Sequence, residues 1–377
     1  MNNPKIWLSS PHMGGNEQKF VQEAFETNWV APLGPNVTGF EKDLEKYIGN
    51  KNHVTALSSG TAALHLGLIL LGVKPGDEVI CQSMTFSASA NPIAYVGATP
   101  IFIDSESDTW NICPNALEDA IKDRIAKGKK PKVIIAVHLY GMPYKVDEVN
   151  AVANKYEIPI LEDSAEALGS TYKGKNCGTF GNIAALSFNG NKIITTSGGG
   201  AIVTNNLDFK NKALFLATQA RDNAPHYQHS EIGYNYRMSN ICAGIGRGQM
   251  EVLDERVRLR RQMNEFYKEI FKKNEGIVVF SEPSSDYFSN HWLSAISVDP
   301  IKNNNKTRED LRLFLEKENI ESRPLWKPMH LQPVFKDAPY YGGQVSEKLF
   351  DNGLCLPSGS NLQPEEKSRI ENMLKLF

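Results

Sequence analysis

From residue 51 onward the sequence alternates between short apolar runs and stretches with helical periodicity, and this alternation limits the fold more than any other feature. Strands that alternate with helices of about ten residues predict βαβ units and a mostly parallel sheet. We therefore expect an α/β fold with a large seven-stranded sheet. Its strands are Val54–Leu57, Glu78–Gln82, Thr99–Ile103, Lys132–Val137, Ile158–Leu161, Ile183–Phe188 and Ala201–Thr204. Helices are expected between the earlier strands, at Ala62–Leu71, Ala88–Val96, Ala116–Ala126 and Val146–Tyr156.

The rest of the chain predicts more helices and a second, smaller domain. Helices are expected at Asn16–Thr27, up to Tyr47, and from Asn205 to Gln219. A long charged helix, Ile241–Lys272, leads into a smaller C-terminal α/β part. Its expected elements are strands near Val278–Phe280 and Trp292–Val298 and helices at Arg308–Lys317 and from Gln363. We divide the chain into a large domain, 1–245, and a small domain, 246–377.

Charge and hydropathy exclude several kinds of partner. The 377 residues include 41 Lys+Arg and 43 Asp+Glu, so we expect binding to neither nucleic acid nor an anionic membrane. The most apolar stretch, 62–73, contains His65 and is too short to span a bilayer. Residues 1–10 lack the basic start and apolar run of a signal peptide, and we expect a cytoplasmic protein.

Cysteine and histidine spacing predicts no metal site. The five scattered cysteines form neither a CxxC motif nor a disulfide framework, and two of them, Cys81 and Cys355, lie in apolar runs typical of a core. His226 and His229 lie in a polar segment without a credible third ligand.

Polar residues follow several predicted strands, and ligands of parallel sheets bind at the carboxyl ends of the strands. Ser58-Ser59-Gly60-Thr61 joins a strand to a helix, so its backbone N–H groups and helix dipole suit a phosphate. A plain capping turn would have the same sequence. Asp163, at another strand end, is suited to a ribose, a metal or a ring nitrogen; a carboxylate beside a pyridine nitrogen keeps it protonated.

Lys192 lies in a polar, glycine-flanked loop between two predicted strands. A lysine amine in such a place can form a Schiff base with a carbonyl, although a surface lysine in a hairpin connection is the plain alternative. Gly198–Gly200 precede a β-branched strand and not a helix, which argues against a nucleotide-binding loop. These glycines indicate backbone that passes close to another group.

Taken together, these residues meet the requirements of pyridoxal phosphate. The Gly60–Thr61 turn supplies an anion cradle, Phe86 a ring stacker, Asp163 a partner for the pyridine nitrogen, Ser187 a hydroxyl and Lys192 an amine for the aldehyde. The convergence of these groups on one strand-end edge makes an inert Lys192 the weaker interpretation.

The sequence resembles the DegT/DnrJ/EryC1/StrS family of pyridoxal-phosphate-dependent nucleotide-sugar aminotransferases over nearly its whole length. The matching segments are SSGTAALHL at 58–66, TFSASANPI at 85–93, HLYGMP at 138–143, EDSAEALGS at 162–170, SFNGNKIITTSGGGAIV at 187–203, GYNYRMSN at 233–240 and RPLWKPMH at 323–330. PHMGGNE at 11–17 and NWVAPLG at 28–34 resemble the branch that aminates UDP-4-keto-6-deoxy-N-acetylhexosamine, as in bacillosamine synthesis. The resemblance implies the fold-type I aminotransferase fold.

The resemblance also implies roles for individual residues. Lys192 would bond to the cofactor and move the proton, and Asp163 would pair with the pyridine nitrogen. The phosphate would be held by Gly60, Thr61 and Ser187, and by Asn235 from the partner subunit.

Further roles concern the ring and the substrate. Phe86 would cover the ring face. Glu166 stands where many members have glutamine, near the ring's 3-oxygen, where an acid would repel a phenolate unless one of the two holds a proton; a structural role for Glu166 is equally consistent. Trp29, Arg237 and His330 are candidate substrate contacts, although structural hydrogen bonding would also explain His330.

The expected reaction transfers an amino group from glutamate to the C4 ketone of a nucleotide-linked 4-keto-6-deoxy sugar, UDP-2-acetamido-2,6-dideoxy-4-keto-hexose. A GDP-linked 4-keto-6-deoxymannose, as in perosamine synthesis, is the alternative substrate, and a cofactor-binding regulator is the non-enzymatic alternative. Lys192 favours amination, because superfamily members that dehydrate sugars have histidine there. The resemblance implies a homodimer with shared active sites.

Overall fold

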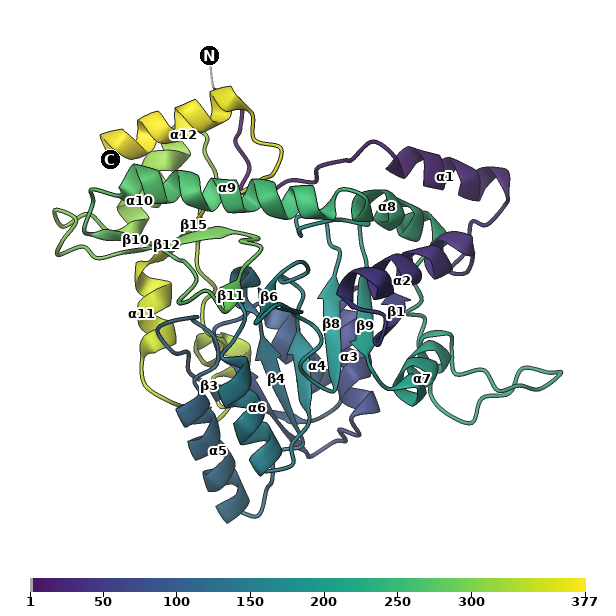
Figure 1. Cartoon of the computed structure of the whole chain (residues 1–377). Helices are drawn as coiled ribbons and strands as arrows, with labels where there is room; N and C mark the ends of the chain where they lie inside the picture. Colours follow the sequence, from purple (N-terminus) through teal and green to yellow (C-terminus); the bar gives the residue numbers. More distant parts are fainter. Residues whose placement is uncertain (1–2) are drawn as a thin grey trace.

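The computed structural model describes residues 3–377, and its large domain is built on an eight-stranded sheet (Figure 1). The strand order is β1-β9-β8-β5-β4-β2-β3-β14. The bounds are β1 His53–Leu57, β2 Glu78–Gln82, β3 Thr99–Ile103, β4 Val133–Val137, β5 Ile160–Asp163, β8 Ile183–Ser187, β9 Gly200–Thr204 and β14 Tyr340–Tyr341. All seven predicted strands are confirmed. The eighth, β14, was missed because two residues are too few to show an alternating pattern.

One strand of the large sheet, β9, runs antiparallel to its neighbours. β9 pairs antiparallel with both β1 and β8, and the pairs from β8 through β14 are parallel. The carboxyl ends of β1, β2, β4, β5 and β8 therefore lie at the same edge as the start of β9. This edge collects the polar residues that the sequence places after its strands.

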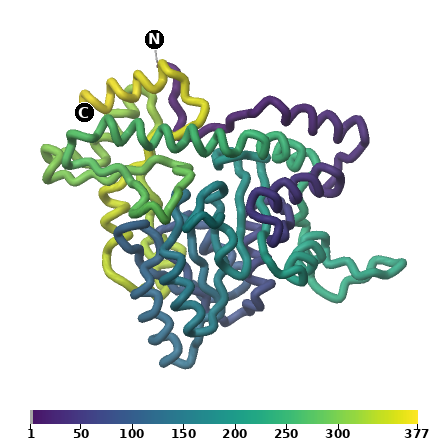
Figure 2. The backbone as a smooth tube through the Cα atoms, in the orientation of Figure 1, coloured from purple at the N-terminus to yellow at the C-terminus, as the bar shows by residue number. Residues whose placement is uncertain are grey.

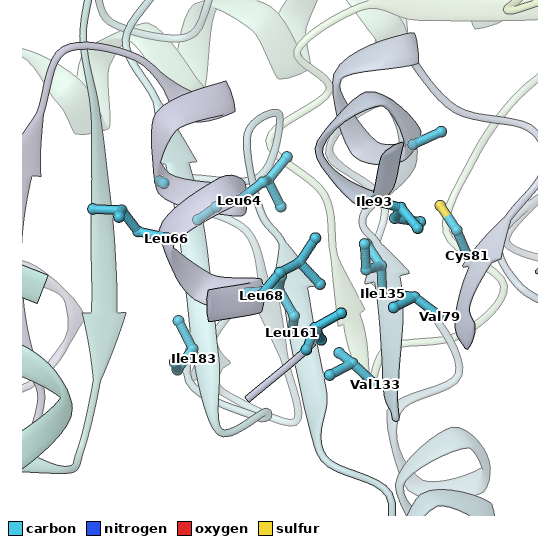
Figure 3. Close-up of a cluster of buried hydrophobic side chains, with 14 of the residues drawn as sticks. Leu64, Leu66, Leu68, Val79, Cys81, Ile93, Val133, Ile135, Leu161 and Ile183 are labelled. Atoms are coloured by element: carbon cyan, nitrogen blue, oxygen red, sulfur yellow. The ribbon is translucent and has the colours of Figure 1, made fainter. Parts of the chain in front are cut away.

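Successive side chains along each strand pack into hydrophobic cores on opposite faces of the sheet. Helices α3 (Gly60–Leu70), α4 (Ser87–Tyr95) and α7 (Leu207–Ala217) pack on one face (Figure 3). On the opposite face lie α2 (Pro35–Ile48), α5 (Pro114–Ala126) and α6 (Val146–Lys155). In β2, for example, Val79 and Cys81 face α3 and α4, whereas Ile80 faces the other core.

The long helix predicted at 241–272 is two helices, α8 (Asn240–Met250) and α9 (Leu253–Phe271). Glycines let α8 lie close to the helices before the sheet: a Cβ at Gly248 would lie 2.7 Å from the Glu17 nitrogen of α1 (Glu17–Glu26). α9 begins in the same core as α8, through Leu253 and Val257, and continues into the C-terminal core. The second helix therefore connects the two cores. A domain boundary at 245/246, which stays a proposal, falls inside α8.

The C-terminal core surrounds a four-stranded sheet, β10-β12-β15-β13, which α9 crosses (Figures 1 and 2). Its elements are β10 Ile277–Val279, β12 Ser294–Val298, β13 Arg323–Pro324, β15 Gly353–Leu356, α10 Arg308–Lys317, α11 Val345–Asn352 and α12 Pro364–Leu376. A small three-stranded sheet comprises β6 Thr171–Tyr172, β7 Lys175–Asn176 and β11 Tyr287–Phe288. The start of the chain also joins the C-terminal core, since buried Ile6 bridges to Ile320.

Two expectations about residue classes can be compared with the structure. All five cysteines have free thiols, and Cys81 and Cys355 are buried as predicted. Among residues 3–377, no helix has both the length and the apolar character needed to cross a membrane.

Candidate active site

A cavity of about 280 Å³ opens at the strand-end edge of the large sheet. Its lining comes from segments far apart in sequence, because each βα junction delivers a few residues to the same edge. The predicted site residues that meet there are Gly60, Thr61, Phe86, Asp163, Glu166, Ser187 and Lys192.

The start of α3 forms a cradle lined by backbone. The Ser59 side chain caps the helix by accepting a hydrogen bond from the Ala62 N–H at 3.0 Å. The N–H groups of Gly60 and Thr61 lie in the first turn, where a helix offers no acceptor of its own. A Cβ at Gly60 would lie 2.9 Å from the Ser187 Cβ, and one at Gly200 only 2.3 Å from the Ser59 carbonyl carbon. The expected close approach of the glycine segment is therefore confirmed at Gly200, and the cradle fits a phosphate.

Asp163 ends β5 with its carboxyl group fixed from two sides. Its Oδ2 accepts a hydrogen bond from the Ser89 hydroxyl at 2.6 Å, and its Oδ1 accepts one from the Ala165 N–H at 3.2 Å. Ser89 in turn shares a 2.7 Å hydrogen bond with the Thr85 hydroxyl. Ser89 was not predicted as a site residue; the only signal was its place one turn beyond the strand-end residue Phe86.

Lys192 is largely buried, and its amine has two close neighbours. The Nζ lies 3.5 Å from the Glu166 Oε1 and 3.9 Å from the centre of the Trp292 ring. The Glu166 Oε2 accepts a hydrogen bond from the Tyr140 N–H at 2.6 Å. Burial raises the pKa of Glu166 despite the opposing effects of Lys192 and of this hydrogen bond. Glu166 therefore holds a proton more readily than an exposed glutamate, as an acid beside a phenolate would require.

Aromatic side chains form another wall of the cavity. Phe86, which is 49% exposed, lies with its ring centre 5.2 Å from that of Trp326. The buried indole N–H of Trp326 has no hydrogen-bond partner within residues 3–377, and Trp292 completes the wall beside Lys192. Neither tryptophan was predicted as a site residue, although the quoted segment RPLWKPMH contains Trp326.

Two of the other predicted residues are engaged in structural contacts outside the cavity. The Arg237 guanidinium pairs with Glu41 and donates to the Ala56 carbonyl. The His330 ring shares a 2.6 Å hydrogen bond with the Ser83 hydroxyl and stacks on Tyr340 at 3.8 Å.

Trp29 and Asn235 are exposed and do not line the cavity within this chain. The roles predicted for all four residues stay predictions. The His229 Nδ1–H donates a 2.8 Å hydrogen bond to the Gln219 carbonyl oxygen. The described residues contain no group of three His, Cys, Asp or Glu arranged to hold a metal ion.

Comparison with known proteins agrees with this geometry. Residues 11–375 match the model of the "DegT/DnrJ/EryC1/StrS aminotransferase family". The chain is 52% identical to a Bacillus subtilis protein named "Putative pyridoxal phosphate-dependent aminotransferase EpsN", over 99% of this chain and 96% of that protein. It is 38% identical to a GDP-perosamine synthase of Escherichia coli O157:H7, over 96% and 95%.

A solved structure extends the comparison to the fold. The "Putative sugar aminotransferase Spr1654 from Streptococcus pneumoniae, PLP-form" superposes with a TM-score of 0.89 at 28% identity, covering 99% of this chain and 98% of that one. The expected fold-type I aminotransferase fold is confirmed. The protein belongs to the DegT/DnrJ/EryC1/StrS aminotransferase family.

Proposed function

We propose that the protein binds pyridoxal 5'-phosphate and transfers an amino group from glutamate to the C4 keto group of a nucleotide-linked 4-keto-6-deoxy sugar, for the synthesis of a surface polysaccharide or glycan. The sugar we favour is UDP-2-acetamido-2,6-dideoxy-4-keto-hexose. The observation that carries the proposal is the meeting, in one cavity, of the Lys192 amine, the Asp163 carboxyl group and the backbone cradle at the start of α3.

Each part of the cavity fits one part of the cofactor. The N–H groups of Gly60 and Thr61 and the Ser187 hydroxyl would hold the phosphate, Asp163 would face the pyridine nitrogen, and Phe86 would cover the ring. Pyridoxal phosphate supplies an aldehyde that bonds to amines and a ring that accepts electrons from the bond being broken. Ser89 holds the Asp163 carboxyl group in a fixed direction, which the cofactor's ring nitrogen requires.

Lys192 would work as a base and an acid at its Nζ. When its amine is free, it would take the proton from the α-carbon of the amino donor and pass it to the cofactor. In the second half-reaction it would move a proton from the cofactor to the sugar's C4. Glu166 and the Trp292 ring border this amine and restrict where it can move. Because only 11% of the Lys192 side chain is exposed, its amine has little contact with bulk water.

The cavity leaves a role for a second copy of the chain. Its volume of about 280 Å³ lies just below the range of about 300–1,000 Å³ for small-molecule sites, and Lys192 is its one cationic side chain within the described residues. Glutamate and a nucleotide diphosphate bring several negative charges that this lining does not balance. We propose a homodimer in which exposed residues such as Asn235 complete the partner's site.

The test is an assay of amino transfer from glutamate with two keto sugars. The proposal predicts 2-oxoglutarate release and an amino sugar with the UDP-linked 4-keto-6-deoxy-N-acetylhexosamine. Turnover with GDP-4-keto-6-deoxymannose alone would support the second candidate, which the 38% identity to a GDP-perosamine synthase favours. Turnover with neither sugar would contradict both.

A further inference from the structure

Trp292 contacts the loop of Lys192 in two independent ways. Its ring lies under the Lys192 amine at 3.9 Å, and its indole N–H donates a 2.6 Å hydrogen bond to the carbonyl of Asn191, the residue before the lysine. Trp292 itself is 1% exposed, so it has no freedom to move with the loop. One side chain therefore fixes both the backbone and the side-chain end of the lysine. We call residues 189–192 the lysine loop.

A buried arginine connects Trp292 to a second hydrogen-bond donor of the Asn191 carbonyl. Arg260 of α9 donates to the Trp292 carbonyl at 2.6 Å and to the Ser9 hydroxyl at 2.9 Å. The Ser9 hydroxyl donates in turn to the same Asn191 carbonyl, at 2.9 Å. Three segments that are distant in sequence, at Ser9, Arg260 and Trp292, are thereby tied to one carbonyl oxygen of the lysine loop. Because Arg260 is 1% exposed, leaving its guanidinium without these acceptors would be costly.

The same segment also positions the acid beside the lysine. The Asn290 side-chain amide donates to the Glu166 carbonyl and to the Leu168 carbonyl, both at 2.9 Å, and its Oδ1 accepts the Trp292 N–H at 2.8 Å. Residues 290–292 therefore fix the backbone of Glu166 and the loop of Lys192 relative to each other. Asn290 carries no role in the proposed function so far, and Trp292 only borders the Lys192 amine there.

We propose that Trp292 is a positioning residue for proton transfer by Lys192, with Arg260 and Ser9 as its anchors. The inference rests on the proposed function, because it assumes that Lys192 moves a proton. The π face of Trp292 attracts the ammonium form of the lysine and keeps the released side chain beside the reacting carbon. The indole N–H keeps the lysine loop in place when the Lys192 amine is no longer bonded to the cofactor.

Activity measurements on two variants separate the ring from the N–H group. Trp292→Phe keeps a ring and loses the donor, whereas Trp292→Leu loses both. Since a misplacement of 1 Å can cost about 100-fold, we expect kcat to fall about 10-fold in the first variant and about 100-fold in the second. KM for both substrates should stay within about threefold of the wild type, because Trp292 acts on the proton and not on binding.

A deuterium isotope effect tests the step directly. With glutamate deuterated at its α-carbon, the isotope effect on the first half-reaction should rise in both variants, because proton transfer becomes slower than the other steps. Trp110→Phe is the matched control: Trp110 is also buried, belongs to the same hydrophobic cluster and stacks on Phe280, but does not touch the lysine loop. It should leave kcat and the isotope effect unchanged.

A second readout uses the cofactor-free protein and needs no turnover. Hydrogen exchange at the backbone amides of residues 192–196 should be faster in Trp292→Leu than in the wild type and unchanged in Trp110→Phe. Ser9→Ala, which removes the other donor to Asn191, should have a small effect alone and a more than additive effect with Trp292→Phe.

The outcomes separate the two proposals. If the wild type forms no amino sugar, the proposed function fails while the exchange experiment still reports on the anchoring. If the wild type is active and Trp292→Leu shows the wild-type isotope effect and exchange rates, the positioning role is wrong. It is also wrong if Trp110→Phe produces the same changes.

Discussion

The two walls of the cavity are built by different means. The cradle wall comes from strand ends of one sheet, so the chain direction alone brings Gly60, Asp163, Ser187 and Lys192 together. Apart from Phe86, which follows β2, the aromatic wall comes from Trp292 and Trp326, which reach the cavity through the packing of the C-terminal part against the large sheet. The first wall offers the groups that a cofactor requires, and the second restricts the lysine that reacts with it. Substitutions in the two walls should therefore lower the activity in different ways.

The largest effect is expected at Lys192. Lys192→Ala should lower turnover by at least about 10⁴-fold, because it removes both the amine that bonds to the cofactor and the base that moves the proton. The visible absorbance band of the lysine-bound cofactor should vanish, while circular dichroism of the fold stays unchanged. Lys130→Ala, an exposed lysine, is the control and should behave as the wild type. Normal turnover in Lys192→Ala would refute the assignment of the cradle wall.

Asp163→Asn should have the next largest effect. The amide keeps the size of the carboxyl group but cannot hold a proton on a ring nitrogen, so we expect kcat to fall about 1,000-fold, or about 4 kcal/mol. The band of the bound cofactor should persist, since Lys192 is intact. A variant with normal kcat would show that Asp163 serves only the hydrogen bond with Ser89.

A smaller effect tests the close approach behind the cradle. Gly200→Ala places a Cβ 2.3 Å from the Ser59 carbonyl carbon, and we expect a loss of about 1–3 kcal/mol in the free energy of unfolding, with weaker cofactor binding. Gly198→Ala is the control for stability, because a Cβ there meets no atom within 4 Å. Denaturant titration of the cofactor-free proteins measures the difference. Equal stability of the two variants would mean that the cradle is not tightly packed.

The sequence predicted the cradle wall well and the aromatic wall poorly, for a physical reason. Residues such as Asp163 lie at strand ends, and a parallel sheet brings the carboxyl ends of its strands together whatever the conformation of the loops. Trp292 precedes a strand of another sheet, and nothing local indicates that its ring meets Lys192. The break between α8 and α9 was missed because residues 250–253 contain no proline or glycine to indicate it.

The smallest effect concerns pH and Glu166. Because burial raises the pKa of Glu166 above 4.5, the folded state holds this proton more tightly than the unfolded state. The stability from this group is full below about pH 4.5 and is lost as the pH rises through the folded pKa. Glu166→Gln removes that loss, so the cofactor-free variant should be more stable than the wild type at pH 8 and match it near pH 4.

Thermal or denaturant unfolding at both pH values measures this difference. Glu275→Gln, at an exposed position, should show no such dependence. A Glu166→Gln variant that is less stable than the wild type at pH 8 would mean that the ion pair with Lys192 outweighs the burial of the acid.

The central claim is that Lys192 bonds to pyridoxal phosphate in a cradle made by this chain. The most direct measurement is to incubate the purified protein with the cofactor, reduce it with borohydride and locate the modified lysine by peptide mass spectrometry. The account predicts one dominant adduct, on Lys192, that is absent from Lys192→Ala. An adduct on another lysine, or none at all, would contradict it.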